Sequence, residues 1–310
     1  MNLALVAPFL QKKGVYGPPT ATLDWCEVNH QFSPYIAEMA NSFSNLFTVT
    51  LSVIGYLEAT RQGLPARYSS GYAGVALVGI GSFFFHATLL FEAQLADELP
   101  MIYVASMSLF LLWDSEPGFG LAKRRTKGLI GLLALFDGVF TWSYMLNRNP
   151  LYHQLTFALL VLSTALRISY ILKHTPARTL IPPHKKKSII SFFSTGAAIF
   201  ALGFVVWNLD NIFCGVLTRW KVSVGWPAAF LLEGHSWWHV LTVGWVILLL
   251  WKGLNHFFFF LGPWDVLYVH WDPITLCAKD DPKHYEVYYR YWLPHVAKLK
   301  DTDTDAKRTS

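Results

Sequence analysis

Seven stretches of the chain are long and apolar enough to cross a lipid bilayer, and this restricts the fold more than any other feature. A membrane-spanning helix needs roughly 20 mostly apolar residues. The stretches are residues 35–57, 71–91, 98–113, 129–146, 151–172, 188–210 and 227–250. Only 15% of all residues are charged, against about 25% in typical soluble domains. We therefore predict an all-α integral membrane protein built as a seven-transmembrane helix bundle.

The predicted bundle divides the chain into three regions. Residues 1–34 form an N-terminal segment, residues 35–252 the bundle, and residues 253–310 a tail. The tail has two aromatic stretches, 256–271 and 284–299, which we expect along the membrane interface because Trp and Tyr favour that position. Its polar end, DTDTDAKRTS, predicts a disordered stretch.

The distribution of Lys and Arg predicts the orientation of the bundle. Cytosolic loops of membrane proteins carry an excess of these residues. The loops after the first, third and fifth spans hold 11 of them, and the loops after the second, fourth and sixth hold 3. We therefore expect a lumenal N-terminus and a cytosolic C-terminus. The net charge of +5 follows from this pattern and requires no nucleic-acid partner.

Three histidines are predicted to lie near the outer end of the bundle. His235 and His239 are four residues apart and share one helix face, and His86 lies near the outer end of the second span. Ionisable side chains are costly at membrane depth and mark functional sites. Three imidazoles with an open fourth position are a ligand set of catalytic zinc, so we predict zinc at His86, His235 and His239. Histidines that serve only packing are the alternative, and His153 is a competing ligand.

Ser82 and Asp97 indicate that this zinc site is hydrolytic. Ser82 lies one helical turn before His86, and Asp97 lies near the end of the short acidic loop FEAQLADE. Zinc with three neutral imidazole ligands lowers the pKa of bound water towards about 7 and polarises a carbonyl group. We expect Asp97 to take the water's proton and pass it to a leaving amine. Ser82 would stabilise the oxyanion or fix the water. The depth of the site indicates a lipid substrate.

The order of these motifs resembles the alkaline ceramidases. The matching strings are TLDWCEVNHQFSPYIAEMANSFSNL (22–46), GSFFFHATLLFEAQLADELPMIY (81–103) and LLEGHSWWHVLT (231–242). These are seven-span zinc amidases, in a group that includes the adiponectin and progestin receptors. The resemblance implies hydrolysis of ceramide, arriving from the bilayer, to a sphingoid base and a free fatty acid. It also implies an endoplasmic reticulum membrane, with the Golgi membrane as the alternative, and names no protein partner.

The N-terminal segment contains oxygen-bearing side chains that suit calcium, which prefers about six to eight oxygen ligands. Taken alone, this stretch fits a solvated acidic segment. The resemblance implies a calcium site instead, formed by Asp24, the backbone carbonyl of Trp25, Glu27, Asn29 and Glu38. Such an ion would fasten the N-terminal segment to the first span.

Two cysteines fall on the oxidising outer side in the predicted topology. We expect Cys26 and Cys214 to form a disulfide that ties the N-terminal segment to the loop after the sixth span. The alternative is a pair of unrelated free thiols.

Two other functions fit part of the pattern. A seven-span receptor of the adiponectin-receptor type would share the zinc site with little or no hydrolysis, but those receptors keep the N-terminus in the cytosol. A transporter or channel would have charged residues spread along its spans, whereas here they gather at one end. We rank the ceramidase first. The sequence distinguishes neither the class of ceramide nor its acyl length.

Overall fold

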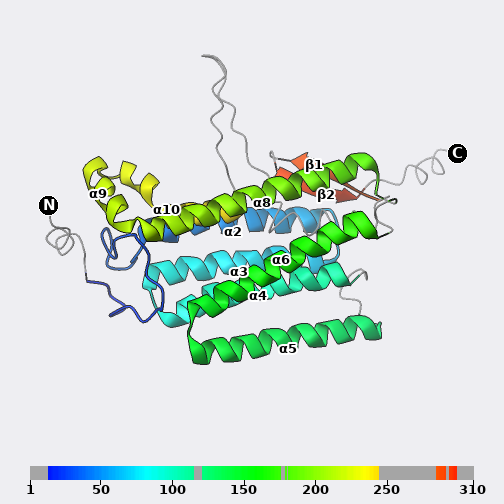
Figure 1. Cartoon of the computed structure of the whole chain (residues 1–310), viewed down its shortest axis with the longest axis horizontal. Helices are drawn as coiled ribbons and strands as arrows, with labels where there is room; N and C mark the ends of the chain where they lie inside the picture. The colour runs from blue at the N-terminus through cyan, green and yellow to red at the C-terminus, as the bar shows by residue number, and fades with distance from the viewer. Residues whose placement is uncertain are drawn as a thin grey trace, which may run out of the picture.

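The computed structural model describes residues 13–114, 121–175, 179, 181–243, 284–290 and 293–298, and most of them are helical (Figure 1). The long helices are α2 (Met39–Arg61), α3 (Ala66–Thr88), α4 (Phe91–Trp113), α5 (Arg124–Asn147), α6 (Pro150–His174) and α8 (Pro183–Ile212). They are followed by α9 (Cys214–Val224), the 3₁₀ helix η1 (Ala228–Leu232), α10 (Gly234–Val243) and the strands β1 (Tyr285–Arg290) and β2 (Leu293–Lys298).

Five of the described helices are long and apolar enough to cross a membrane, namely α3, α4, α5, α6 and α8. They match the second to sixth predicted spans and agree with a multi-pass membrane protein. α2 occupies the first predicted span but is too polar to join this group. η1 and α10 begin the seventh, whose residues 244–250 lie outside the described residues. The count of seven spans and the orientation in the membrane stay predictions.

The helices surround an internal space. α2, α3, α4 and α6 pack side by side in chain order, and α10 packs between α2 and α8. α5 packs mainly on α4, at the outside of the bundle (Figure 1). Within the described residues, α6 and α8 are not among the closely packed pairs of helices. The wall around the internal space is therefore least tightly packed between α6 and α8.

Three segments differ from the sequence prediction. The string FEAQLADE, predicted as a loop, forms the first turns of α4, because Leu89 in the left-handed conformation (φ 54°) reverses the chain within two residues after α3. The predicted loop after the sixth span contains α9. The second aromatic stretch forms an antiparallel hairpin of β1 and β2, which departs from the all-α prediction, while its position at the membrane interface stays a prediction. The stretch 256–271 and the final ten residues lie outside the described residues.

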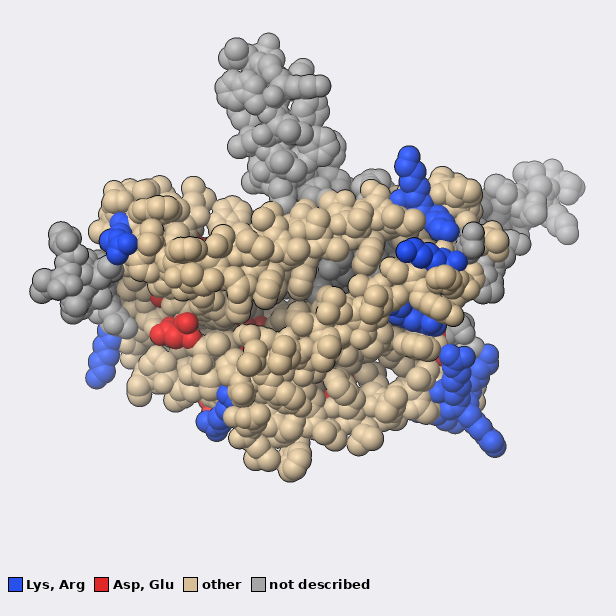
Figure 2. Space-filling view, viewed as in Figure 1, with Lys and Arg blue, Asp and Glu red and all other residues tan. Residues whose placement is uncertain are grey.

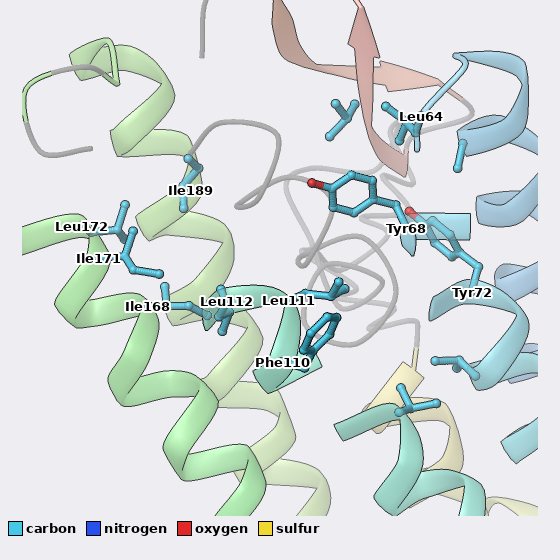
Figure 3. Packing of buried hydrophobic residues seen from close by; sticks show 14 of the residues in the cluster. Leu64, Tyr68, Tyr72, Phe110, Leu111, Leu112, Ile168, Ile171, Leu172 and Ile189 are labelled. Carbon is cyan, nitrogen blue, oxygen red and sulfur yellow. The ribbon is translucent and has the colours of Figure 1, made fainter. Parts of the chain in front are cut away.

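A hydrophobic cluster fills one end of the bundle, which we call the hairpin end because β1 and β2 lie there (Figure 3). It draws side chains from α2, α3, α4, α6, α8 and β2, among them Leu64, Tyr68, Tyr72, Phe110, Leu111, Leu112, Ile168, Ile171, Leu172, Ile189 and Val296. Tyr285 and Val287 pack against it from β1, since alternate residues of a strand share a face. The hairpin therefore completes the core of this end.

Polar contacts also hold the hairpin. The hydroxyl of Tyr288 contacts the carboxylate of Glu58 on α2. The ammonium group of Lys185 on α8 donates to the main-chain carbonyl oxygen of Tyr285. The hairpin thereby joins the end of the first long helix to the start of the last one, two elements that are far apart in sequence.

Lys and Arg side chains gather at the hairpin end, near the starts of α5 and α8 (Figure 2). The sequence places Lys123, Arg124, Arg125 and Lys127 at the start of α5, and Lys185, Lys186 and Lys187 in the first turns of α8. This is the end for which we predict a cytosolic position.

The opposite end, which we call the histidine end, is fastened by the predicted disulfide between Cys26 and Cys214. Beside it Lys221 of α9, only 1% exposed, donates to Glu233 at 2.5 Å and to the main-chain carbonyl oxygen of Cys26 at 3.4 Å. A buried charge is tolerated only when it is paired. The N-terminal segment, α9 and the residue before α10 therefore form one connected unit.

The hairpin should stabilise the whole bundle. Val296→Ala removes two methyl groups from the cluster, and we expect it to lower the free energy of unfolding by about 1–3 kcal/mol. Thermal unfolding in detergent measures this as a lower midpoint. Lys298→Ala, on the exposed end of the same strand, is the matched control and should leave the midpoint unchanged. Equal midpoints for both variants would show that the hairpin is not part of the core.

Candidate metal centre and cavity

The three histidines predicted to bind zinc meet at the histidine end. His86 lies in the last turn of α3, and His235 and His239 lie in the first turns of α10. Within the described part of the chain, they are the one group of three or more His, Cys, Asp or Glu residues whose ligand atoms all lie within 4.8 Å of one another. All three are buried. The Nε2 atoms of His86 and His235 lie 3.3 Å apart. Two imidazole nitrogens bound to the same tetrahedral zinc ion are also about 3.3 Å apart.

Glu38 sets the hydrogen position on His86. Its Oε2 lies 2.5 Å from His86 Nδ1, and the carboxylate is fully buried. A carboxylate accepts from a ring N–H, so Nδ1 carries the hydrogen and Nε2 keeps its lone pair. Histidine ligands of metals commonly donate their other ring N–H to a carboxylate in this way.

Ser44 does the same for His239. Its hydroxyl lies 2.7 Å from His239 Nδ1 and 2.9 Å from the main-chain carbonyl oxygen of Asn41. The carbonyl can only accept, so it takes the hydroxyl hydrogen and Ser44 accepts from Nδ1. His239 therefore also presents Nε2.

Trp25 holds the third ring by stacking. Its indole lies against His235 with the ring centroids 3.8 Å apart and the planes inclined by 18°. Nδ1 of His235 is buried and has no hydrogen-bond partner within the described residues. The start of α10 is fixed by Asp210 of α8, whose Oδ1 accepts from the main-chain N of Gly234 at 3.0 Å.

Ser82 and Asp97 are held together by the close packing of α3 on α4. The Ser82 hydroxyl donates to the Asp97 carboxylate. Gly81 makes this approach possible, because a Cβ at that position would overlap the main-chain carbonyl of Ala96. Two residues that are 15 positions apart thus present a hydroxyl and a carboxylate as a pair.

A cavity of about 510 Å³ lies beside these groups. Ser82, Asp97, His235 and His239 line its histidine end. The rest of the wall is mainly apolar and comes from α3, α4, α6, α8 and α10, including Val75, Val78, Met101, Phe157, Val161, Phe193, Phe200, Phe204 and Trp238. The cavity therefore combines a polar reaction site with a long apolar compartment, which suits a lipid.

The comparison with known families decides the identity of the chain. A family model described as Ceramidase matches residues 17–296, which include every described helix and most of the hairpin. The chain belongs to the ceramidase family. This confirms the family expected from the sequence.

Individual ceramidases agree with this assignment. The chain is 34% identical over 237 residues to alkaline ceramidase 3 of Mus musculus, covering 76% of this chain and 84% of the relative. It is 32% identical over 243 residues to alkaline ceramidase YPC1 of Saccharomyces cerevisiae, covering 74% of each chain. An alkaline ceramidase of Arabidopsis thaliana is 28% identical over 225 residues, covering 73% of this chain and 79% of the relative. The protein is a ceramidase hydrolase, which favours the enzyme over the receptor and the transporter.

The residues predicted to bind calcium in this ceramidase lie together in the N-terminal segment and the start of α2. Asn29 donates to Asp24 at 3.1 Å, and the main-chain N of Trp25 donates to Glu38 at 3.3 Å. Glu27 accepts from the main-chain N atoms of Ala40 and Asn41 at the start of α2. The carboxylates of Asp24, Glu27 and Glu38 do not, however, form a group as compact as the three histidines.

Two features of this segment fit a cation. The Oδ1 atom of Asn29 is buried and has no hydrogen-bond partner within the described residues. Burial, together with the nearby carboxylates of Glu233 and Glu38, raises the pKa of Glu27 to about 8. A bound cation would supply the missing partner and offset the repulsion among the carboxylates.

The sequence did not reveal the partners of the histidines. Glu38 was predicted only as a calcium ligand. Ser44 was not predicted as a partner, nor was Asn45, whose Nδ2 lies 3.3 Å from His239 Nδ1. The spacing held a signal, because Glu38, Asn41 and Asn45 are separated by three and four residues and share a helix face. His153, the competing ligand, lies elsewhere and bonds to the main-chain carbonyl oxygen of Glu98 at 3.0 Å.

Gly81 provides a test of the Ser82–Asp97 pair. Gly81→Ala should force α3 and α4 apart and lower the free energy of unfolding by about 1–3 kcal/mol. A shift of about 1 Å in reacting groups costs on the order of a hundredfold in rate, so hydrolysis of ceramide should fall by about that factor. Activity and thermal unfolding measure the two effects.

The matched control is Gly71→Ala on the same helix, where an added Cβ meets only Met107 at an ordinary 3.9 Å. This variant should keep both activity and stability. Normal activity in Gly81→Ala would contradict the importance of the close helix approach.

Proposed function

We propose that this ceramidase hydrolyses the amide bond of ceramides within the membrane and uses a zinc ion held by His86, His235 and His239. Membership of the family supports ceramide hydrolysis. The zinc requirement rests on the geometry, above all on the 3.3 Å between the Nε2 atoms of His86 and His235. We place the enzyme in the endoplasmic reticulum membrane on the family resemblance.

Asp97 and Ser82 supply the proton transfers in this proposal. Asp97 lines the cavity with the histidines and is positioned by Ser82. It accepts the proton of the attacking water and then donates it to the nitrogen of the scissile amide, so that the sphingoid base leaves as a neutral amine. Once Asp97 carries the water's proton it no longer needs the single hydrogen of Ser82, and the Ser82 hydroxyl then donates to the carbonyl oxygen as negative charge develops there. One carboxylate thus acts first as a base and then as an acid.

The apolar compartment would hold the fatty acyl chain. The cavity wall on α8 extends from Trp207 to Phe193, which at helical rise is about 21 Å. This exceeds half of the roughly 30 Å hydrocarbon thickness of a bilayer. A long acyl chain can therefore lie along the helices with its carbonyl at the histidine end. Because α6 and α8 are not a closely packed pair within the described residues, the lipid would enter between these two helices.

A calcium ion is the second metal in the proposal, with ligands from Asp24, the carbonyl of Trp25, Glu27, Asn29 and Glu38. Its support is the unsatisfied oxygen of Asn29 and the accumulation of carboxylates. Since Trp25 stacks on His235 and Glu38 bonds to His86, an ion here would also stiffen two of the histidines.

His239→Ala tests the zinc site. We expect the purified variant to lose its zinc, measured by elemental analysis, and to lose at least about a hundredfold in release of fatty acid from ceramide. The matched control is His174→Ala, at the exposed end of α6, which should keep both. Full zinc content in His239→Ala would contradict the ligand assignment. Absence of ceramide hydrolysis by the natural protein would overturn the proposed reaction.

Removal of calcium tests the N-terminal site. Chelation with EGTA should lower the thermal midpoint of the natural protein, and added calcium should restore it, because a ligand of the folded state stabilises by mass action. In Asp24→Ala and Asn29→Ala the response should move to calcium concentrations at least about tenfold higher. Glu92→Gln, an exposed carboxylate on α4, is the control. An unchanged response in both ligand variants would exclude the site.

A further inference from the structure

Glu98 lines the cavity next to Asp97 and has no part in the steps above. It is 5% exposed, and its Oε2 accepts from the Gln94 amide at 3.0 Å and from the Tyr144 hydroxyl. Among the described residues no group donates a hydrogen bond to its other oxygen, Oε1. Because Glu98 lines the cavity, this oxygen is free to accept a hydrogen bond from a bound ligand.

His153 offers a second acceptor beside it. Its Nε2 lies 3.0 Å from the main-chain carbonyl oxygen of Glu98, which can only accept, so Nε2 carries the hydrogen. In the neutral ring Nδ1 is then an acceptor. It lies 3.9 Å from Glu98 Oε1, which is too long for a direct hydrogen bond. The described part of the cavity wall therefore presents two neighbouring acceptors and no donor between them.

We propose that Glu98 and His153 bind the hydroxyl groups of the sphingoid base and so determine the substrate class of this ceramidase. The inference rests on the proposed function, in which Asp97 faces the amide nitrogen. In a ceramide the hydroxyl-bearing carbons adjoin the carbon that carries this nitrogen. A substrate with its nitrogen at Asp97 brings these hydroxyls to the next residue of α4 and to the facing turn of α6. Each hydroxyl donates one hydrogen, which matches the two acceptors.

The two acceptors predict that the enzyme prefers substrates that carry both hydroxyl groups of the sphingoid base. Dihydroceramide should be hydrolysed with a kcat/KM at least about a hundredfold above that of an N-acyl alkylamine of equal length, since that analogue leaves both acceptors unpaired. 1-Deoxydihydroceramide should fall between the two. All three substrates place the same acyl chain in the apolar compartment. Its contribution to binding therefore cancels when their kcat/KM values are compared.

Glu98→Gln and His153→Asn test the assignment. Gln keeps an oxygen for Tyr144 and replaces the other acceptor by a donor. In both variants the preference for dihydroceramide over the alkylamide should fall at least about tenfold, mainly through KM, while kcat/KM for the alkylamide stays within about twofold. Glu92→Gln on α4 and Thr156→Val on α6, whose hydroxyl bonds only within its helix, are the matched controls and should keep the full preference.

The outcomes separate this inference from the proposed function. Equal losses for all three substrates would assign Glu98 and His153 a structural role and overturn the inference, while ceramide hydrolysis would stand. Binding of dihydroceramide and the alkylamide to the Asp97→Asn protein in nanodiscs gives a readout without turnover. If the natural protein hydrolyses no ceramide, the proposed function fails, and equal affinities in that binding measurement would overturn the inference as well.

Discussion

The hydrogen bond between Glu38 and His86 is the contact on which the site depends. A carboxylate buried inside an apolar bundle is tolerated only with a partner, and this one lies at the start of α2, where the helix dipole also favours negative charge. The main chain fixes the position, because Glu38 N donates to the carbonyl oxygen of His86 at 2.9 Å and Ala37 N donates to that of Ala87 at 2.9 Å. The start of α2 is thus joined to the end of α3.

The two ends of the bundle are stabilised by different kinds of interaction. At the hairpin end, apolar side chains from six elements form a hydrophobic cluster, with the hairpin as its last layer. At the histidine end, charged and polar groups are paired inside the protein, and the disulfide and Lys221 fasten them. The cavity lies between. Its polar end holds the proposed reaction site, and its apolar length suits a hydrocarbon chain.

The sequence predicted much of this because a membrane simplifies the problem. Once the apolar stretches are assigned and the chain alternates direction, residues at the same depth are limited to a few. His86, His235 and His239 could be grouped by depth and helical spacing, and Cys26 and Cys214 by the side of the membrane. Ser82 and Asp97 were expected near them for the same reason, and the structure pairs them through the close approach at Gly81.

The tertiary structure decided which residues at the same depth in the membrane lie beside one another, because depth alone does not specify this. The sequence determined the helical bundle, the histidine trio and the cysteine pair. Only the fold could show that Glu38 and Ser44 orient the rings, that Trp25 stacks on His235, and that β1 and β2 complete the hairpin end. The same holds for Glu98 and His153, on different helices 55 positions apart. Their meeting depends on which faces of α4 and α6 pack together, and that choice depends on the shapes of all the surrounding side chains at once.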